Sequence, residues 1–96
     1  MAEVVGETEA QIVKARLQSA YEAFGLLIPF QIKDRKIIDD VRVKYLAVAT
    51  PLMLAAKGEY QEGGKEYQAT LVLANALIDR IANITQEATQ GIAILI

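Results

Sequence analysis

The sequence predicts an all-α fold, either a three-helix bundle or a long antiparallel helical hairpin, with a short extended apolar C-terminal tail. Three segments, at about 8–24, 34–57 and 65–90, carry apolar residues at the three- to four-residue spacing of amphipathic helices. All six glycines lie outside these segments, where they favour turns and helix ends. We therefore expect one helical domain over residues 1–96.

The first predicted helix starts with a clear capping signal. Thr8 is followed three residues later by Gln11, which is the spacing of a capping box. Gly25 is expected to end this helix. The connector 26–32 is apolar and contains Pro29, and we expect its side chains to pack across the core. The apolar residues of the helix share one narrow face: Val13, Leu17, Ala20, Tyr21 and Phe24.

The second predicted helix changes character along its length. Asp34 is a suitable N-cap, and the first half is amphipathic. Residues 47–56 are apolar on every side except for Thr50, which predicts that this half is surrounded. Pro51 lacks an N–H group and is expected to bend the helix near 47–50 or to divide it in two.

A basic cluster lies at the start of this helix, but its pattern does not favour nucleic acid. Asp39 and Asp40 stand four residues from cluster members, in the pairs Arg35–Asp39, Lys36–Asp40 and Asp40–Lys44. A solvated face of ion pairs explains this pattern. The net charge is −2, so no broad field attracts phosphates and no nucleic-acid partner is expected. The cluster comprises Lys33, Arg35, Lys36, Arg42 and Lys44.

The segment 57–71 carries a local resemblance to known helical hairpins. Its glycines, aromatic residues and small residues follow the order Gly58, Tyr60, Gly63, Tyr67, Thr70 and Leu71. In this order it resembles the middle of a tetratricopeptide repeat and is similar to the hairpin of MIT domains. The resemblance implies a peptide-binding helical module whose helix starts near Glu59. Without this resemblance, the sequence predicts that Gly63 and Gly64 form a loop before a helix that starts near residue 65.

The aliphatic tail, residues 91–96, is the most unusual part of the sequence. Gly91 is expected to end the third helix, and the tail is expected to continue as an extended segment. Each large aliphatic side chain gains roughly 1.5–3 kcal/mol on burial. We therefore expect the tail to be covered, either by its own domain or by another chain.

Composition limits the chemistry that this chain can perform. It contains neither Cys nor His, so it offers no disulfide, thiolate or imidazole. No phosphate-binding loop, nucleophile elbow or metal-ligand spacing appears. We expect no enzymatic activity, no cofactor and no metal, and we expect the four tyrosines to pack their rings and keep their hydroxyls in water. The sequence also suggests no signal peptide and no transmembrane helix, and hence a cytoplasmic protein, or a virion component if the protein is viral.

The apolar surplus points to association. Hydrophobic residues make up 53% of the chain, more than a domain of this size hides easily. The sequence therefore favours a non-catalytic, self-assembling structural subunit of a virion or another multi-subunit assembly, whose partner is a copy of itself or another protein. An adaptor that binds a peptide or helix of a partner is the alternative, and a membrane-associated assembly protein is a weaker one. The expected interface residues are Ile92, Ile94, Leu95, Ile96, Leu71, Ile78, Ile81 and Leu52.

Overall fold

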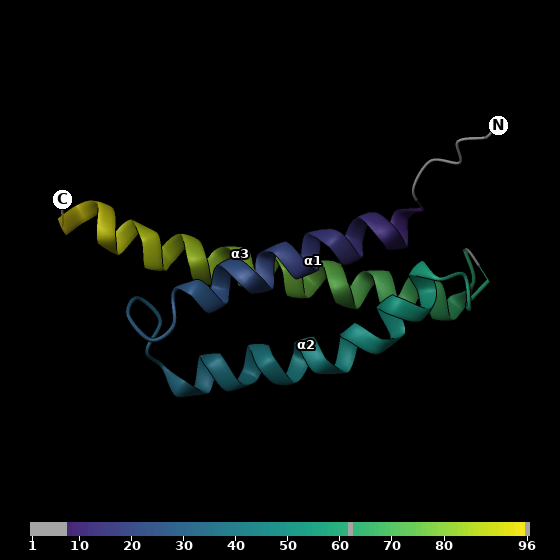
Figure 1. Ribbon diagram of the computed structural model, residues 1–96, viewed down its shortest axis with the longest axis horizontal. Coiled ribbons are helices and arrows are strands. Elements are labelled where there is room, and N and C mark those ends of the chain that lie inside the picture. Colours follow the sequence, from purple (N-terminus) through teal and green to yellow (C-terminus); the bar gives the residue numbers. More distant parts are fainter. Residues whose placement is uncertain (1–7, 62, 96) are drawn as a thin grey trace.

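The described part of the chain forms three helices that pack on one another. The structure is a computed structural model that describes residues 8–61 and 63–95, with side chains described as far as Gln90. The helices are α1 (Glu9–Leu26), α2 (Arg35–Ala56) and α3 (Lys65–Leu95). They run up, down and up, so that α1 and α3 are parallel and α2 is antiparallel to both (Figure 1). Each helix contacts the other two, which confirms the predicted three-helix bundle.

The predicted capping box starts α1. The Thr8 hydroxyl accepts a hydrogen bond from the Gln11 N–H at 3.2 Å, and the Thr8 N–H donates to Gln11 Oε1 at 3.0 Å. Gln11 Nε2 also donates to the Ala56 carbonyl at 3.2 Å, which joins the start of α1 to the end of α2. The helix ends at Leu26, so Gly25 lies in its last turn and is not the stop that we predicted. The cap residue, Leu27, keeps a right-handed conformation, so this end needs no glycine.

Three further expectations concern the cap of α2, the effect of Pro51 and the packing of the connector 26–32, and they are confirmed in part. Asp34 caps α2, and its Oδ1 accepts from the Lys36 N–H at 2.9 Å. The helix passes through Pro51 as one element and changes direction along its length (Figure 1). In the connector, Ile32 is buried as expected, whereas Leu26 and Phe30 are exposed.

The hairpin between α2 and α3 is a loop built on two glycines. Gly58 and Gly63 have φ values of +84° and +83°, in the left-handed region that suits a residue without Cβ. α3 begins at Lys65. Gly63 and Gly64 therefore lie in the loop before α3 and not inside a helix that starts near Glu59.

The core runs along the space between the three helices. Its largest fully buried side chains are Phe24 and Leu17 from α1, Leu52 from α2 and Ile81 from α3. Tyr67 is buried as well, and its hydroxyl oxygen accepts a hydrogen bond from the Ala10 N–H at 3.2 Å. The expectation that tyrosine hydroxyls stay in water is thus wrong for Tyr67. The first N–H groups of a helix lack intrahelical partners, and this hydroxyl satisfies one of them.

Replacing Tyr67 with phenylalanine is expected to lower the free energy of unfolding by about 1–2 kcal/mol. The change leaves the buried Ala10 N–H without its acceptor, and an unsatisfied buried group carries a penalty of this size. Urea denaturation followed by circular dichroism measures the loss. Tyr45→Phe is the control: this tyrosine stacks on Tyr21 with ring centroids 3.9 Å apart, and within the described residues its hydroxyl makes no hydrogen bond. Equal losses in the two variants would contradict the role given to the Tyr67 hydroxyl.

The C-terminal segment departs from the prediction. The backbone stays helical through Gly91 to Leu95, so an extended tail is wrong over these residues. A glycine inside a helix costs about 1 kcal/mol relative to alanine, but it keeps its N–H group, and no proline follows it. α3 consequently runs past the end of α1 (Figure 1). The side chains of 91–95 and the whole of Ile96 lie outside the described part of the structure.

Candidate protein-binding groove

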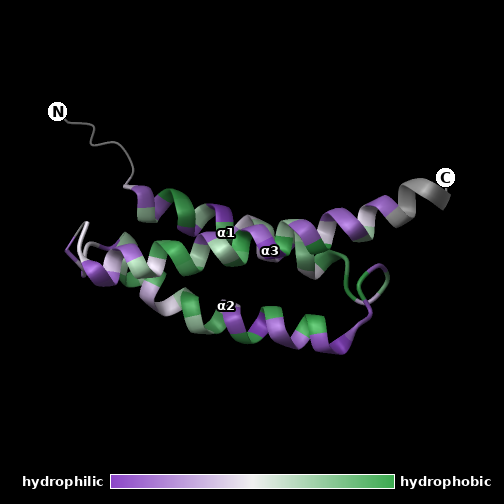
Figure 2. Ribbon diagram, turned by 180° about the vertical axis from the view of Figure 1, so that it is seen from behind, coloured by the Kyte–Doolittle hydropathy of each residue, from purple (hydrophilic) through white to green (hydrophobic). Residues whose placement is uncertain are grey.

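Large aliphatic side chains stand in solvent on α2 and α3. Val43 and Leu46 on α2, and Val72 and Leu73 on α3, are each between 60% and 66% exposed. Hydrophobic stretches on these two helices are visible in Figure 2. A single exposed aliphatic residue is ordinary, but several on adjoining helices are typical of a contact surface.

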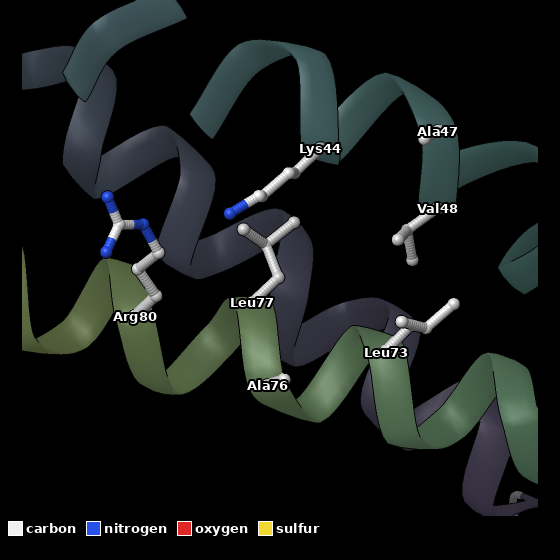
Figure 3. A pocket seen from close by; sticks show the side chains of 7 residues that line it. All are labelled: Lys44, Ala47, Val48, Leu73, Ala76, Leu77 and Arg80. Carbon is white, nitrogen blue, oxygen red and sulfur yellow. The ribbon is translucent and has the colours of Figure 1, made fainter. Parts of the chain in front are cut away.

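A groove lies between these two helices. Val48 and Leu77 are buried and form its floor, and Ala47, Leu73 and Ala76 line its sides. Its volume is about 370 Å³. Figure 3 looks into the groove, with α1 behind it. The opening is therefore on the side of the bundle opposite α1.

The sequence produces this groove by placing alanines where the two helices face outward. Ala47 and Ala76 are both exposed and lie on opposite sides of the groove. Their methyl groups leave room that longer side chains at the same positions would occupy. The floor belongs to the core stripes of the two helices, because Val48 and Leu77 pack with the other buried residues. The groove is thus a consequence of the same 3.6-residue periodicity that forms the core.

One end of the groove carries positive charge. Lys44 Nζ lies 3.2 Å from Asp40 Oδ2, and Arg80 Nε lies 3.1 Å from the same oxygen. One carboxylate thus serves two cations, which leaves this end with a net charge of +1. The two basic side chains are about half-exposed, so they remain available to an anionic group on a partner.

The charged face predicted at the start of α2 is only partly formed. The predicted Asp40–Lys44 pair is present. Arg35 and Lys36 form no ion pair with Asp39 or Asp40 in the described part of the chain. The contact with Arg80 joins residues 40 positions apart, and helical spacing alone does not indicate it.

The expected interface residues fall into two groups. Leu52, Leu71, Ile78 and Ile81 lie in the core of the bundle, where the chain's own helices bury them. Ile92, Ile94 and Leu95 lie in the segment whose side chains are not described, and Ile96 is outside the described residues. Sequence reasoning missed the groove. The sequence signal that could have found it is the presence of apolar residues off the core stripes of the second and third helices, at Ala47, Leu73 and Ala76.

The groove is suited to apolar side chains. Its lining is aliphatic apart from Lys44 and Arg80. Among the described residues, no three or more acidic, histidine or cysteine side chains gather where a metal ion would bind. None of the described helices combines the length and the apolar character needed to cross a membrane. Comparisons of this chain with protein-family models, curated proteins and solved structures give no match.

Proposed function

We propose that this protein is a non-catalytic helical subunit that assembles with copies of itself through the α2/α3 groove and its apolar rims. Such a subunit would serve in a virion or another multi-subunit assembly. The observation that carries the proposal is the apolar groove, whose sides are formed by Ala47, Leu73 and Ala76. Further exposed aliphatic residues stand on the same two helices, namely Val43, Leu46 and Val72. Hydrophobic contact is the main favourable term in most protein association.

The size of this apolar surface supports association that depends on concentration. The side chains of Val43, Leu46, Val72 and Leu73 are about two-thirds exposed, so covering each would contribute roughly 1–2 kcal/mol, or about 4–8 kcal/mol together. Association itself costs an estimated 4–15 kcal/mol in lost freedom of motion. Copies are therefore expected to separate on dilution.

The tail provides a second apolar contribution to the proposal. The segment 91–96 contains four large aliphatic residues and no charge. We include it in the assembly contact because α3 carries it past the end of α1 (Figure 1). Contact of this segment with a neighbouring copy adds apolar burial to that of the groove.

The substitution Ile94→Asp tests the contribution of the tail. We expect sedimentation velocity to show species larger than a monomer for the wild type, growing with concentration. The variant is expected to associate at least tenfold more weakly and to keep its helical circular dichroism, because Ile94 lies beyond the last described core residues, Ile84 and Ala88. A wild type that stays monomeric up to millimolar concentration would refute self-assembly. An unchanged association constant in the variant would remove the tail from the proposal.

A second candidate function is an adaptor that binds an α-helix of another protein. The basic end of the groove, at Lys44 and Arg80, favours this alternative because it suits an amphipathic helix with one acidic end. The two functions differ in a simple measurement. An adaptor is a monomer at all concentrations and binds an added acidic, leucine-rich helical peptide, whereas a self-assembling subunit associates without any partner.

A further inference from the structure

We propose that copies of this chain join head to tail, with the outer face of α1 in one copy seated in the α2/α3 groove of the next. This inference rests on the proposed self-assembly and adds which surface occupies the groove. It assigns to the groove a second copy of the chain and predicts assemblies that can grow beyond two subunits.

The outer face of α1 carries aliphatic residues, one acidic residue and one basic residue. The buried residues Val13, Leu17 and Phe24 fix the side of α1 that faces the core. On the other side, Ile12 and Leu26 are exposed aliphatic residues. The exposed residues between them on that side are Ala15, Arg16, Ser19, Glu22 and Ala23. This face therefore offers aliphatic contacts, a carboxylate at Glu22 and a guanidinium at Arg16, six residues nearer the start of α1. It lies on the side of the bundle away from the groove.

Two contacts show which residues lie at the same height along the bundle. The hydrogen bond from Ala10 to Tyr67 sets an offset of 57 residues between the parallel helices α1 and α3. By this offset, Ser19 lies at the height of Ala76, and Glu22 lies at the height of Asp79, one residue before Arg80. Both heights fall within the groove, because Ala76 and Arg80 line it.

The pairing with α2 gives the same heights independently. Tyr21 stacks on Tyr45 with centroids 3.9 Å apart, and α1 and α2 are antiparallel (Figure 1). Glu22 follows Tyr21 in α1, and Lys44 precedes Tyr45 in the antiparallel α2. Glu22 and Lys44 therefore lie at the same height along the bundle. Counted in the same way, Ser19 lies level with Ala47.

We therefore place the second copy by shifting it, without rotation, until the outer face of its α1 meets the groove of the first copy. In this position the two surfaces match in charge and in size. Its Glu22 carboxylate lies over the basic end formed by Lys44 and Arg80, where one Asp40 carboxylate leaves a positive charge. Its Ser19 lies over the alanine-lined part of the groove, at Ala47 and Ala76, where there is space for a close approach. The charge complementarity favours this orientation over the reversed one.

This contact is heterologous, since the two surfaces that meet are different. Every added copy then leaves one free groove and one free α1 face, so assembly continues into a filament, or into a ring if the rotation closes. A helix of 18 residues is about 27 Å long and about 10 Å wide, so its face covers about 270 Å² on each partner. This contact is small beside the total of 1,200–2,000 Å² that a stable interface buries. The assemblies are thus expected to lengthen with concentration.

Two blocking variants test the inference by complementation. Ser19→Arg places bulk and positive charge on the α1 face, over the alanine-lined part of the groove and next to its basic end. Ala76→Arg fills the groove. Both positions are exposed, so both variants are expected to keep the wild-type circular dichroism and melting temperature. Each variant alone is expected to associate at least tenfold more weakly than the wild type in sedimentation velocity.

Mixing the two variants gives the decisive result. The intact α1 face of the Ala76→Arg protein binds the intact groove of the Ser19→Arg protein, so an equimolar mixture is expected to form dimers and nothing larger. A Ser19→Arg protein that assembles as the wild type does would overturn the head-to-tail contact and leave self-assembly standing. A mixture that remains monomeric would overturn it too. A monomeric wild type would refute the inference together with the proposed function.

Discussion

Leu73→Asp is expected to keep the protein monomeric at concentrations at which the wild type assembles. Leu73 lines the groove and is mostly exposed, so the change does not disturb the core. In the assembly it would remove about 1–2 kcal/mol of apolar contact and bring a carboxylate into an apolar surface, which costs several kcal/mol more. We expect the association constant to fall at least a hundredfold, as measured by sedimentation velocity.

Phe30→Asp is the matched control for this experiment. Phe30 is 74% exposed and belongs to the connector between α1 and α2, away from the groove. The same charge is introduced and an apolar surface of similar size is lost, yet the association constant is expected to stay within threefold of the wild type. If Leu73→Asp assembles as strongly as this control, the groove is not the contact surface.

Phe24→Ala is expected to lower the free energy of unfolding by about 3–5 kcal/mol. Phe24 is the largest fully buried side chain in the described residues, and removing a buried aromatic ring loses its transfer free energy and leaves a cavity. Small domains have about 5–15 kcal/mol of stability in total, so this variant is expected to be close to unfolding at 37 °C. Urea denaturation followed by circular dichroism, at a concentration low enough to keep the protein monomeric, measures the change.

The chain contains its own control, because its only other phenylalanine is Phe30. Phe30→Ala removes the same ring from a mostly exposed position and is expected to change the free energy of unfolding by less than about 0.5 kcal/mol. A loss of less than 1 kcal/mol for Phe24→Ala, or similar losses for the two variants, would contradict the placement of the core.

Local signals were enough to predict the helices and most of the core. The Thr8–Gln11 capping box and the Asp34 cap act through hydrogen bonds within three residues, so the sequence contains all of their parts. The apolar stripe of α1 is likewise visible in the spacing of its residues, and the structure buries Val13, Leu17 and Phe24. Local spacing therefore indicated each helix and its inward face, but it did not indicate that α3 continues through Gly91 to Leu95.

Features that depend on two helices meeting were beyond the sequence. Arg80 reaches Asp40 across 40 residues, and the Tyr67 hydroxyl reaches Ala10 across 57. The exposure of Ala47 and Met53 also depends on how α2 and α3 pack, because the segment 47–56 is apolar on almost every side and was expected to be surrounded. Where single-chain packing leaves such residues open, they are accessible to another molecule, and this is the basis of the proposed function.

The labelling rate of a thiol placed in the groove is the most direct test of self-assembly through this surface. The chain has no cysteine, so Ala76→Cys creates a single reporter on the exposed wall of the groove, and Phe30→Cys creates one on the exposed connector. We predict that a maleimide labels the groove reporter at least tenfold more slowly at high protein concentration than after dilution, while the connector reporter reacts at one rate throughout. A groove reporter whose labelling rate is the same at every concentration would contradict the account.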